Sequence, residues 1–154
     1  MMDRVRVIKT AEEMAMLKAS PYLSNDVFLD VFRSIWPGVT KRVLYARMME
    51  GCVMRGFVCA HGILNSDKNT TPYAGESDWV LNSGAVIRTD YFTYLKNYPS
   101  HQSRSAILGK PSPQQASDYA KNLGIYRGAI DRCRAGARVG DIYDWVMAEF
   151  TRAV

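Results

Sequence analysis

The sequence lacks the features that mark membrane, secreted and disulfide-rich proteins. It has no run of about 20 apolar residues that could span a membrane. Residues Met1–Thr10 lack the apolar segment of a secretory signal. The three cysteines, Cys52, Cys59 and Cys133, cannot all pair and are expected to be reduced and buried. We therefore expect a cytoplasmic protein with no membrane partner.

Motifs for several common activities are missing as well. Cys59 and His61 could supply two metal ligands, but no second pair follows at zinc-finger spacing. There is no glycine-rich phosphate loop and no Ser-His-Asp or Cys-His arrangement. The net charge of +5 lies in small basic groups without the interleaved aromatic residues that stack on bases. Nucleic acid is therefore not an expected partner.

The residues that are present describe an ordinary globular domain that begins with a helix. The chain has 154 residues, 47% apolar and 23% charged, and a domain of this length buries about 70% of the surface that its unfolded chain exposes. The Thr10–Glu13 segment is a capping box that predicts a long helix. Pro21 is expected to kink or split this helix, and Pro37-Gly38 to end it. Its apolar stripe would comprise Met14, Leu17, Val27, Val31 and Ile35.

A second helix is predicted from its cap at Thr40 to a stop at Gly56. Its apolar residues Leu44, Met48 and Cys52 recur every four positions, so they should lie on one buried face. The first part of the chain is therefore expected to be a helix pair.

Two more helices are predicted at the carboxyl end. Ser112-Pro113-Gln114-Gln115 begins the first, with the proline at the first helical position, and Asp141 is expected to cap the second. The predicted apolar faces are Ala116, Tyr119, Ala120, Leu123, Ile130 and Cys133 in the first helix and Ile142, Trp145, Val146 and Phe150 in the second.

Antiparallel strands are predicted between the two helix pairs, where β-branched and aromatic residues form short runs. The expected strands are 57–64, 79–81, 85–95 and 101–108. Alternation along the third strand places Arg88, Asp90, Phe92 and Tyr94 on one face and Thr89, Tyr91 and Thr93 on the other. Asp90 and His101 of the neighbouring strand could then face the same cleft.

The stretch from Thr89 to Ser112 carries the most specific signal. His101 follows Asp90 by eleven positions and precedes Arg104-Ser105 and Gly109-Lys110-Pro111-Ser112. This order resembles the pita-bread metallohydrolase family, which includes methionine aminopeptidase, aminopeptidase P, prolidase and creatinase. The family's run is Asp-x-Gly, Gly-Tyr-x-Ser-Asp, x-x-Arg-Thr and Gly-x-Pro-Ser. The resemblance covers nearly the whole chain, because further matches occur at Ile8–Glu13, Asn69–Tyr73 and Ala135–Ile142.

The resemblance implies three site residues, two of which depart from the family's pattern. Asp90 matches the first metal-bridging aspartate, His101 replaces the second aspartate, and Tyr73 replaces a substrate-side histidine. Tyr73 is therefore the candidate catalytic residue, and Asp90 and His101 are the candidate metal ligands. A phenol donates a hydrogen bond to a carbonyl or oxyanion but does not readily shuttle protons near pH 7; alternatively, Pro72-Tyr73 is simply a turn. The family's other ligands, a histidine and two glutamates, lie on later strands, which the chain does not reach by Val154.

The fold class implied by the resemblance is α+β. Residues 1–111 would form one pita-bread half, with two helices and an antiparallel ladder, and residues 112–154 would form the helix pair of the second half. Without a ladder of their own, helices 113–134 and 142–153 would expose an apolar surface that monomers seldom tolerate. A homo-oligomer or a complementing chain is therefore an expected partner.

The candidate ligands limit the metal chemistry. Two-metal hydrolases need several carboxylates to neutralise and bridge the ions, whereas Asp90 and His101 could hold only a single, weakly bound Mn, Zn, Co or Fe ion. Two structural interpretations compete with metal binding. Asp90 could form a salt bridge to Arg88 or Arg104, and His101 could bond to Ser100 or Ser103 or face solvent.

Three functions stay open at this point, and whether the chain is an enzyme is open with them. The first is an Xaa-Pro aminopeptidase- or prolidase-like homologue with a degraded, incomplete metal site and little or no peptidase activity alone. The second is a non-catalytic module that binds peptides or proteins on the same fold. The third is a metal-free, creatinase-like hydrolase of small amides or amidines that uses Tyr73 and His101.

Overall fold

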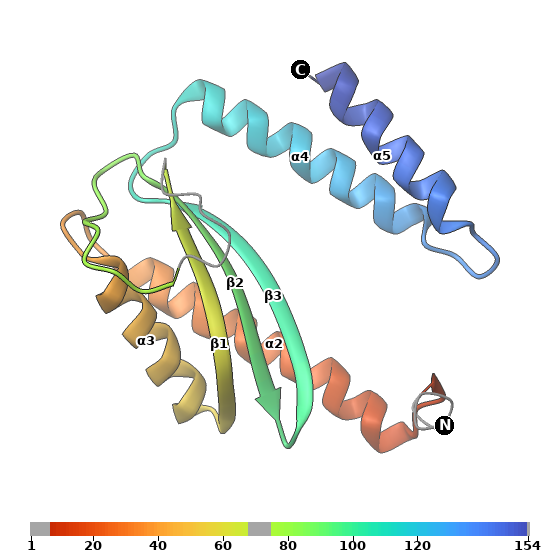
Figure 1. The fold of residues 1–154 in the computed structure, drawn as a ribbon, viewed down its shortest axis with the longest axis horizontal. Helices are drawn as coiled ribbons and strands as arrows, with labels where there is room; N and C mark the ends of the chain where they lie inside the picture. Colours follow the sequence, from red (N-terminus) through yellow and green to blue (C-terminus); the bar gives the residue numbers. More distant parts are fainter. Residues whose placement is uncertain (1–6, 68–74, 154) are drawn as a thin grey trace. The chain divides into compact units, whose positions relative to one another are not determined.

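The computed structural model describes residues 7–67 and 75–153 of the chain, and omits the side chains of residues 59–61. The chain divides into two compact units, Met1–Lys110 and Pro111–Val154. Within the described residues, the elements of the amino-terminal unit are helices α2 and α3 and a three-stranded sheet, and those of the carboxyl-terminal unit are helices α4 and α5 (Figure 1). No described helix has the length and apolarity that crossing a bilayer requires.

Helix α2, Ala11–Ser34, begins with the predicted capping box. The Thr10 hydroxyl accepts from the Glu13 amide, and the Glu13 carboxylate accepts from the Thr10 amide at 2.7 Å. The helix continues through Pro21, so the predicted split is wrong. A proline removes one helical hydrogen bond, and here the contacts of α2 with the sheet keep the two halves of the helix together.

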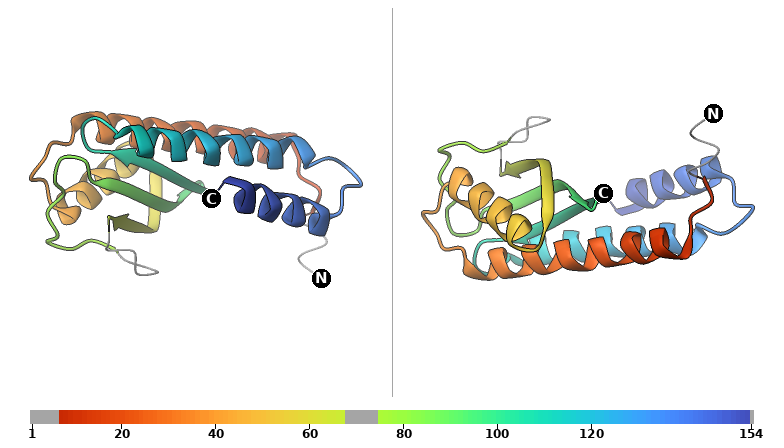
Figure 2. Two further views of the ribbon diagram at one scale, coloured as in Figure 1. Left: turned by 90° about the horizontal axis from the view of Figure 1, so that it is seen from above. Right: turned by 90° about the horizontal axis from the view of Figure 1, so that it is seen from below.

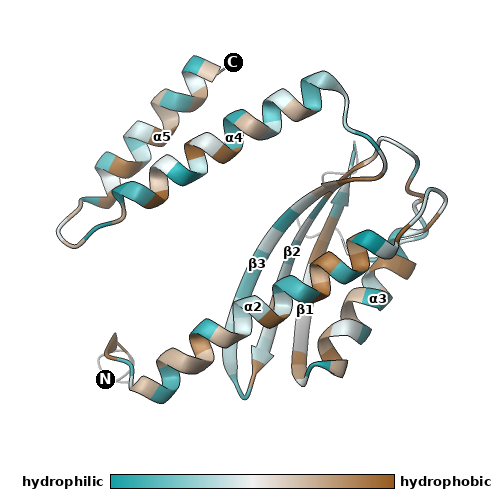
Figure 3. Ribbon diagram, turned by 180° about the vertical axis from the view of Figure 1, so that it is seen from behind, coloured by the Kyte–Doolittle hydropathy of each residue, from teal (hydrophilic) through white to brown (hydrophobic). Residues whose placement is uncertain are grey.

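The two halves of α2 bury different kinds of side chain. The carboxyl-terminal half buries Val27, Phe28 and Val31, where hydrophobic positions gather in Figure 3. In the amino-terminal half the buried residue is Ser20, with Ser24 just past the middle of the helix, while Met14, which the predicted stripe includes, is 41% exposed. The predicted apolar stripe is therefore correct only in the second half of the helix.

Helix α3, Lys41–Met54, has the predicted cap, face and end. The Thr40 hydroxyl accepts from the Val43 amide, and Leu44, Met48 and Cys52 are buried. Gly56 ends the helix with a φ of 79°, a conformation that glycine adopts without strain.

Residues 77–81 cap helix α3 and do not form the predicted strand. The carbonyls of Trp79 and Ser77 accept from the Lys41 and Arg42 amides at 3.0 and 2.8 Å. A single bridge between Thr40 and Val80 is the extent of the β-pairing in this segment. The strand at 79–81 is therefore a wrong prediction: the segment bonds to the first turn of a helix, which has free amides.

The three strands form one antiparallel sheet in the order β1-β2-β3. Their bounds are Phe57–Ser66, Val86–Leu95 and Tyr98–Ile107. Lys96 and Asn97 join β2 to β3 with φ values of 49° and 68°, as expected for a two-residue type I′ hairpin turn. Strand β3 therefore begins three positions before the predicted start at 101.

Both helices of this unit cover one face of the sheet (Figure 2). The covered face of β2 carries Tyr91, whose ring meets Phe28 edge-on at 5.6 Å. The same ring lies over Gly62 of β1, where a Cβ would lie 2.5 Å from it. Burial alternates strictly along β2 from Val86 to Tyr94, so the predicted division of this strand into two faces is confirmed.

Helices α4, Pro113–Arg132, and α5, Val139–Ala153, form the carboxyl-terminal unit. A capping box of Ser112 and Gln115 starts α4 as predicted. Helix α5 starts at Val139, so Asp141 lies within its first turn and is not the predicted cap; a carboxylate is favourable there because the helix amino terminus is positive. The ring of Trp145 occupies the gap at Gly128, where a Cβ would lie 2.3 Å from it.

Little of this second helix pair is buried. Ile125 is the buried residue of α4, and the structure gives none in α5. Cys133 is exposed, contrary to the prediction, because it lies at the end of α4, whereas Cys52 is buried in the first unit. The exposed large apolar residues of the pair are Tyr119, Tyr126, Ile130, Val139, Tyr143, Met147 and Phe150.

Candidate functional site

The structure brings Asp90 and His101 together on the face of the sheet that α2 and α3 do not cover, here called the open face. Asp90 lies on β2 opposite Ser103, and His101 lies on β3 opposite Phe92, so the two residues are diagonal neighbours on one face. His101 Nε2 and Asp90 Oδ1 are in direct hydrogen-bonding contact. The side chains are 50% and 30% exposed, which leaves the pair accessible from solvent.

Two residues that the sequence interpretation did not assign to the site complete its geometry. The Ser103 hydroxyl donates to Asp90 Oδ1 at 2.7 Å, the same oxygen that His101 contacts. The Phe92 and His101 rings are stacked, with centroids 4.1 Å apart and planes 6° apart. Ser103 could have been found from the alternation of β3, because it follows His101 by two positions. The stack depends on the strand register, which the sequence does not specify.

The structural alternatives proposed for Asp90 are both incorrect. Arg88 Nη2 donates to the carbonyl of Asp67 at 3.0 Å. Arg104 lies on the helix-covered face and donates to Asn25 Oδ1 at 2.9 Å. Asp90 therefore bonds to His101 and Ser103, and no salt bridge to either arginine occurs in the described part of the chain.

The alternatives proposed for His101 are also replaced. The Ser103 hydroxyl bonds to Asp90 rather than to the imidazole, and Ser100 is buried on the opposite face of β3. Although half-exposed, His101 has a carboxylate partner and an aromatic neighbour. The imidazole is therefore held on two sides.

The donor set at this site is small. Among the side chains that the structure describes, which exclude those of residues 59–61, no group of three or more histidine, cysteine, aspartate or glutamate residues could hold a metal ion. Asp90 Oδ1 and His101 Nε2 contact one another. One carboxylate and one imidazole fit a single divalent ion, but they do not fit a bridged pair of ions.

Tyr73, the candidate catalytic residue, lies outside the described residues. The segment that follows it is anchored to α3 by an ion pair between Arg42 Nε and Asp78 Oδ1 at 2.9 Å. The hydrogen bond from Arg42, together with its charge, lowers the pKa of Asp78. Lys41 is 1% exposed, and its burial lowers its pKa, an effect that the negative charge of Glu76 opposes. The chain after Tyr73 is thus attached at the start of α3.

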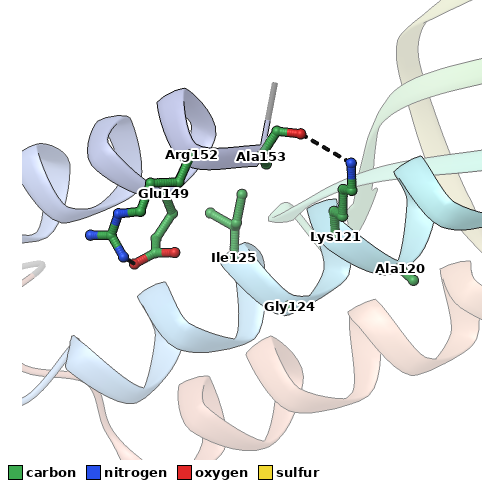
Figure 4. Close-up of a pocket in the computed structure, with 7 residues that line it drawn as sticks. All are labelled: Ala120, Lys121, Gly124, Ile125, Glu149, Arg152 and Ala153. Carbon is green, nitrogen blue, oxygen red and sulfur yellow. Dashed lines mark hydrogen bonds and ion pairs between the residues drawn. The ribbon is translucent and has the colours of Figure 1, made fainter.

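A hollow of about 300 Å³ lies in the other unit, between α4 and α5 (Figure 4). Its charged lining groups already have partners within the chain: Arg152 Nη1 pairs with Glu149 Oε1 at 2.9 Å, and Lys121 Nζ donates to the carbonyl of Ala153 at 3.0 Å. Small residues, Ala120 and Gly124, form part of the remaining wall. Neither Asp90 nor His101 is among the residues that line this hollow.

Comparison with known families places this geometry in context. The model of metallopeptidase family M24 matches residues 15–153. The chain belongs to this family. Enzymes of the M24 family commonly use divalent metals. The described residues of this chain, in contrast, contain no cluster of three side chains that could bind a metal ion.

Curated relatives of this M24 chain are peptidases. The uncharacterized peptidase YqhT of Bacillus subtilis is 24% identical over 135 residues, which is 80% of this chain and 37% of YqhT. The Xaa-Pro dipeptidase of Lactobacillus helveticus is 25% identical over 141 residues, or 87% of this chain and 38% of the dipeptidase. The chain thus spans under two fifths of the length of these two relatives.

Solved structures of peptidases share the fold. Dipeptidase PepE from Mycobacterium ulcerans superposes with a TM-score of 0.89 and 25% identity, over 98% of this chain and 42% of that one. The X-Pro aminopeptidase from Thermotoga maritima gives a TM-score of 0.88 at 22% identity, over 97% of this chain and 43% of that one, and at this identity the match shows the fold alone. The α+β pita-bread architecture predicted from the sequence is confirmed.

Proposed function

We propose that this chain is a homologue of Xaa-Pro aminopeptidases and prolidases with a reduced metal site formed by Asp90 and His101. The site would hold at most one divalent ion, such as Mn, Zn, Co or Fe, and the chain alone would have little or no peptidase activity. The supporting observation is that the carboxylate and imidazole contact each other, without a third metal-binding side chain among the described residues. A bound ion would act there as a Lewis acid.

The proposed ligand is a peptide or a small amide or amidine. The open face of the sheet offers it a carboxylate at Asp90 and a flat surface at the Phe92 and His101 rings. The Ser103 hydroxyl donates to the same Asp90 oxygen that His101 contacts and helps to orient the carboxylate. These groups could bind and orient a ligand without a metal, which supports the alternative of a non-catalytic peptide- or protein-binding module.

The metal-free hydrolase is the third proposal. A carboxylate bonded to one imidazole nitrogen orients the ring, so that the other nitrogen can accept or deliver a proton. His101 with Asp90 has this arrangement, and Tyr73 would supply a hydrogen-bond donor. Loss of function in Tyr73→Phe with the fold intact would favour the metal-free hydrolase. Unaffected ligand affinity in the same variant would favour the binding module.

We also propose that residues 1–111 and 112–154 correspond to one pita-bread half and the helix pair of a second. The apolar surface of α4 and α5 supports a homo-oligomer or a complementing chain as partner. A cytoplasmic location remains part of this proposal.

Native mass spectrometry after incubation with Mn(II) tests the proposal, because it reports bound metal and subunit number together. We expect no more than one ion per chain, lost in both Asp90→Asn and His101→Ala. Asp78→Asn is the matched control, since it removes an exposed carboxylate away from the site and should retain the ion. Two ions per chain, or steady hydrolysis of an Xaa-Pro dipeptide by the chain alone, would contradict the proposal.

A further inference from the structure

Three polar contacts join helix α2 to strand β3. They connect residues far apart in the sequence, and each uses one residue of the helix and one of the strand. The pairs are Tyr98 with Glu13, Gln102 with the Pro21 carbonyl, and Arg104 with Asn25.

The spacing of these contacts matches the geometry of the two elements. From position 13 to 21 a helix rises about 12 Å, and from 98 to 102 a strand advances about 13 Å. The next intervals, 21 to 25 and 102 to 104, correspond to about 6 and about 7 Å. The distances between successive contacts are therefore similar along α2 and along β3, as expected if the helix and the strand run side by side. This support matters because β3 pairs with β2 alone in the described sheet.

The middle of this interface is polar and sparsely bonded. Ser20 Oγ, Thr93 Oγ1 and Ser100 Oγ are buried and have no hydrogen-bond partner among the described residues. Gln102 is 7% exposed, and its Nε2 donates to the Pro21 carbonyl across the interface. In this part of the interface the hydrogen bond between α2 and β3 therefore comes from Gln102, whereas the hydroxyls of Ser20, Thr93 and Ser100 have no partner among the described residues.

Gln102 is also adjacent in sequence to His101, and the two side chains point to opposite faces of the strand. The partners of His101 on the open face, Asp90 and Phe92, both belong to β2. A local displacement of this segment of β3 relative to β2 would therefore change the distances from the His101 ring to both partners.

We propose that Gln102 is a positioning residue for His101. Its contact with Pro21 holds the strand segment that carries the imidazole, and so keeps the His101–Asp90 contact and the His101–Phe92 stack in place within the strand register. This inference rests on the proposed role of His101 in the site.

Proton NMR of the metal-free chain tests it, since the chain has only two histidines, His61 and His101. A His61→Gln background leaves one imidazole signal. The stacked Phe92 ring should move this signal upfield, and Phe92→Leu should abolish the displacement. In Gln102→Met, which keeps length but removes the donor, we expect the displacement to fall by at least half. Gln102→Asn, with a shorter reach, provides the same test if the methionine variant does not fold.

Two controls separate positioning from general destabilisation. Ser20→Ala removes a hydroxyl that has no hydrogen-bond partner in the described part of the chain and should leave the imidazole signal unchanged. Val27→Ala weakens the apolar core and should lower stability, also without moving the signal. An unchanged signal in the Gln102 variants, no effect of Phe92→Leu, or an equal change in Val27→Ala would overturn the inference.

A Mn(II) titration of the same variants distinguishes this inference from the proposed metal site. If wild type binds Mn(II), the affinity of Gln102→Met should be about tenfold weaker, as for other residues that orient metal ligands. Failure of the wild type to bind would contradict the metal proposal, while the NMR test of Gln102 would still decide the positioning role.

Discussion

The two helix pairs of this chain begin alike but are used differently. Helices α2 and α4 both start with a capping box, and α3 and α5 have 14 and 15 residues. Helix α3 buries Leu44, Met48 and Cys52, whereas α5 has no buried residue. Yet apolar residues recur along α5 at helical spacing, as in Tyr143 and Met147. Helical periodicity therefore predicts the helix, but burial requires an element packed against it.

Truncation of one apolar side chain in each pair should give the largest difference. Leu44→Ala leaves a cavity under the sheet and should cost about 3 kcal/mol of unfolding free energy, since Leu44 is fully buried. Met147→Ala, at a position 47% exposed, should change stability by less than about 0.5 kcal/mol. Urea unfolding followed by far-UV circular dichroism measures both. Equal losses would show that the face of α5 is covered in solution.

Glycine replacement sharpens the same comparison at the level of packing. Gly62→Ala places a methyl group against the Tyr91 ring and should cost about 2 kcal/mol, because the tightly packed core must shift. Gly124→Ala in α4 meets nothing within 4 Å, so it should stabilise the helix by up to about 1 kcal/mol. Thermal unfolding of the two variants decides this. A stable Gly62→Ala would mean that the Tyr91 ring can move aside freely.

Low pH should weaken the helix cap at the start of α2 and leave the matching cap of α4 unchanged. This change in stability should be the smallest of the three predicted effects. Hydrogen bonds from the Thr10 amide and the Tyr98 hydroxyl lower the pKa of Glu13. Its contribution to stability is therefore present above the unfolded-state pKa and is lost as pH falls through the lower folded-state value. Gln115 fills the same capping position in α4 but does not titrate.

Urea midpoints measured between pH 7 and pH 3 test this difference. Glu13→Gln should reduce the part of the acid destabilisation that comes from this carboxyl group. Thr10→Ala should act in the same direction, since it removes the other half of the capping box. The prediction fails if Glu13→Gln has the same pH dependence as the wild type.

Much of the secondary structure follows from local signals. The caps at Thr10, Thr40 and Ser112 are read correctly because a side chain and an amide three positions apart satisfy each other. The segment 79–81 is mispredicted, because the carbonyls of Trp79 and Leu81 accept from the amides of Lys41 and Gly38, more than 30 positions away, which no local pattern encodes. The continuity of α2 through Pro21 similarly depends on its contacts with the sheet.

The candidate site was predictable in part. Strand alternation places Asp90 and Phe92 on one face, and the family resemblance adds His101. The hydrogen bond of Ser103 and the stack on Phe92 depend on the register between β2 and β3. That register is set by the two-residue turn at Lys96-Asn97, whose effect is to bring Tyr98 opposite Leu95. A shift of one residue would move every side chain of β3 to the other face.

The starts of α2, α3 and α4, the alternation along β2 and the family resemblance are all encoded locally and could be predicted without a structure. These features arise from hydrogen bonds and steric preferences within a few residues, and from motifs in a fixed order. The bond of Asp90 to His101 rather than to an arginine, and the contact of Gln102 with Pro21, 81 positions away, became evident from the folded chain. Such contacts depend on how the strands pair and how α2 lies against the sheet, because side-chain partners are chosen by proximity in space.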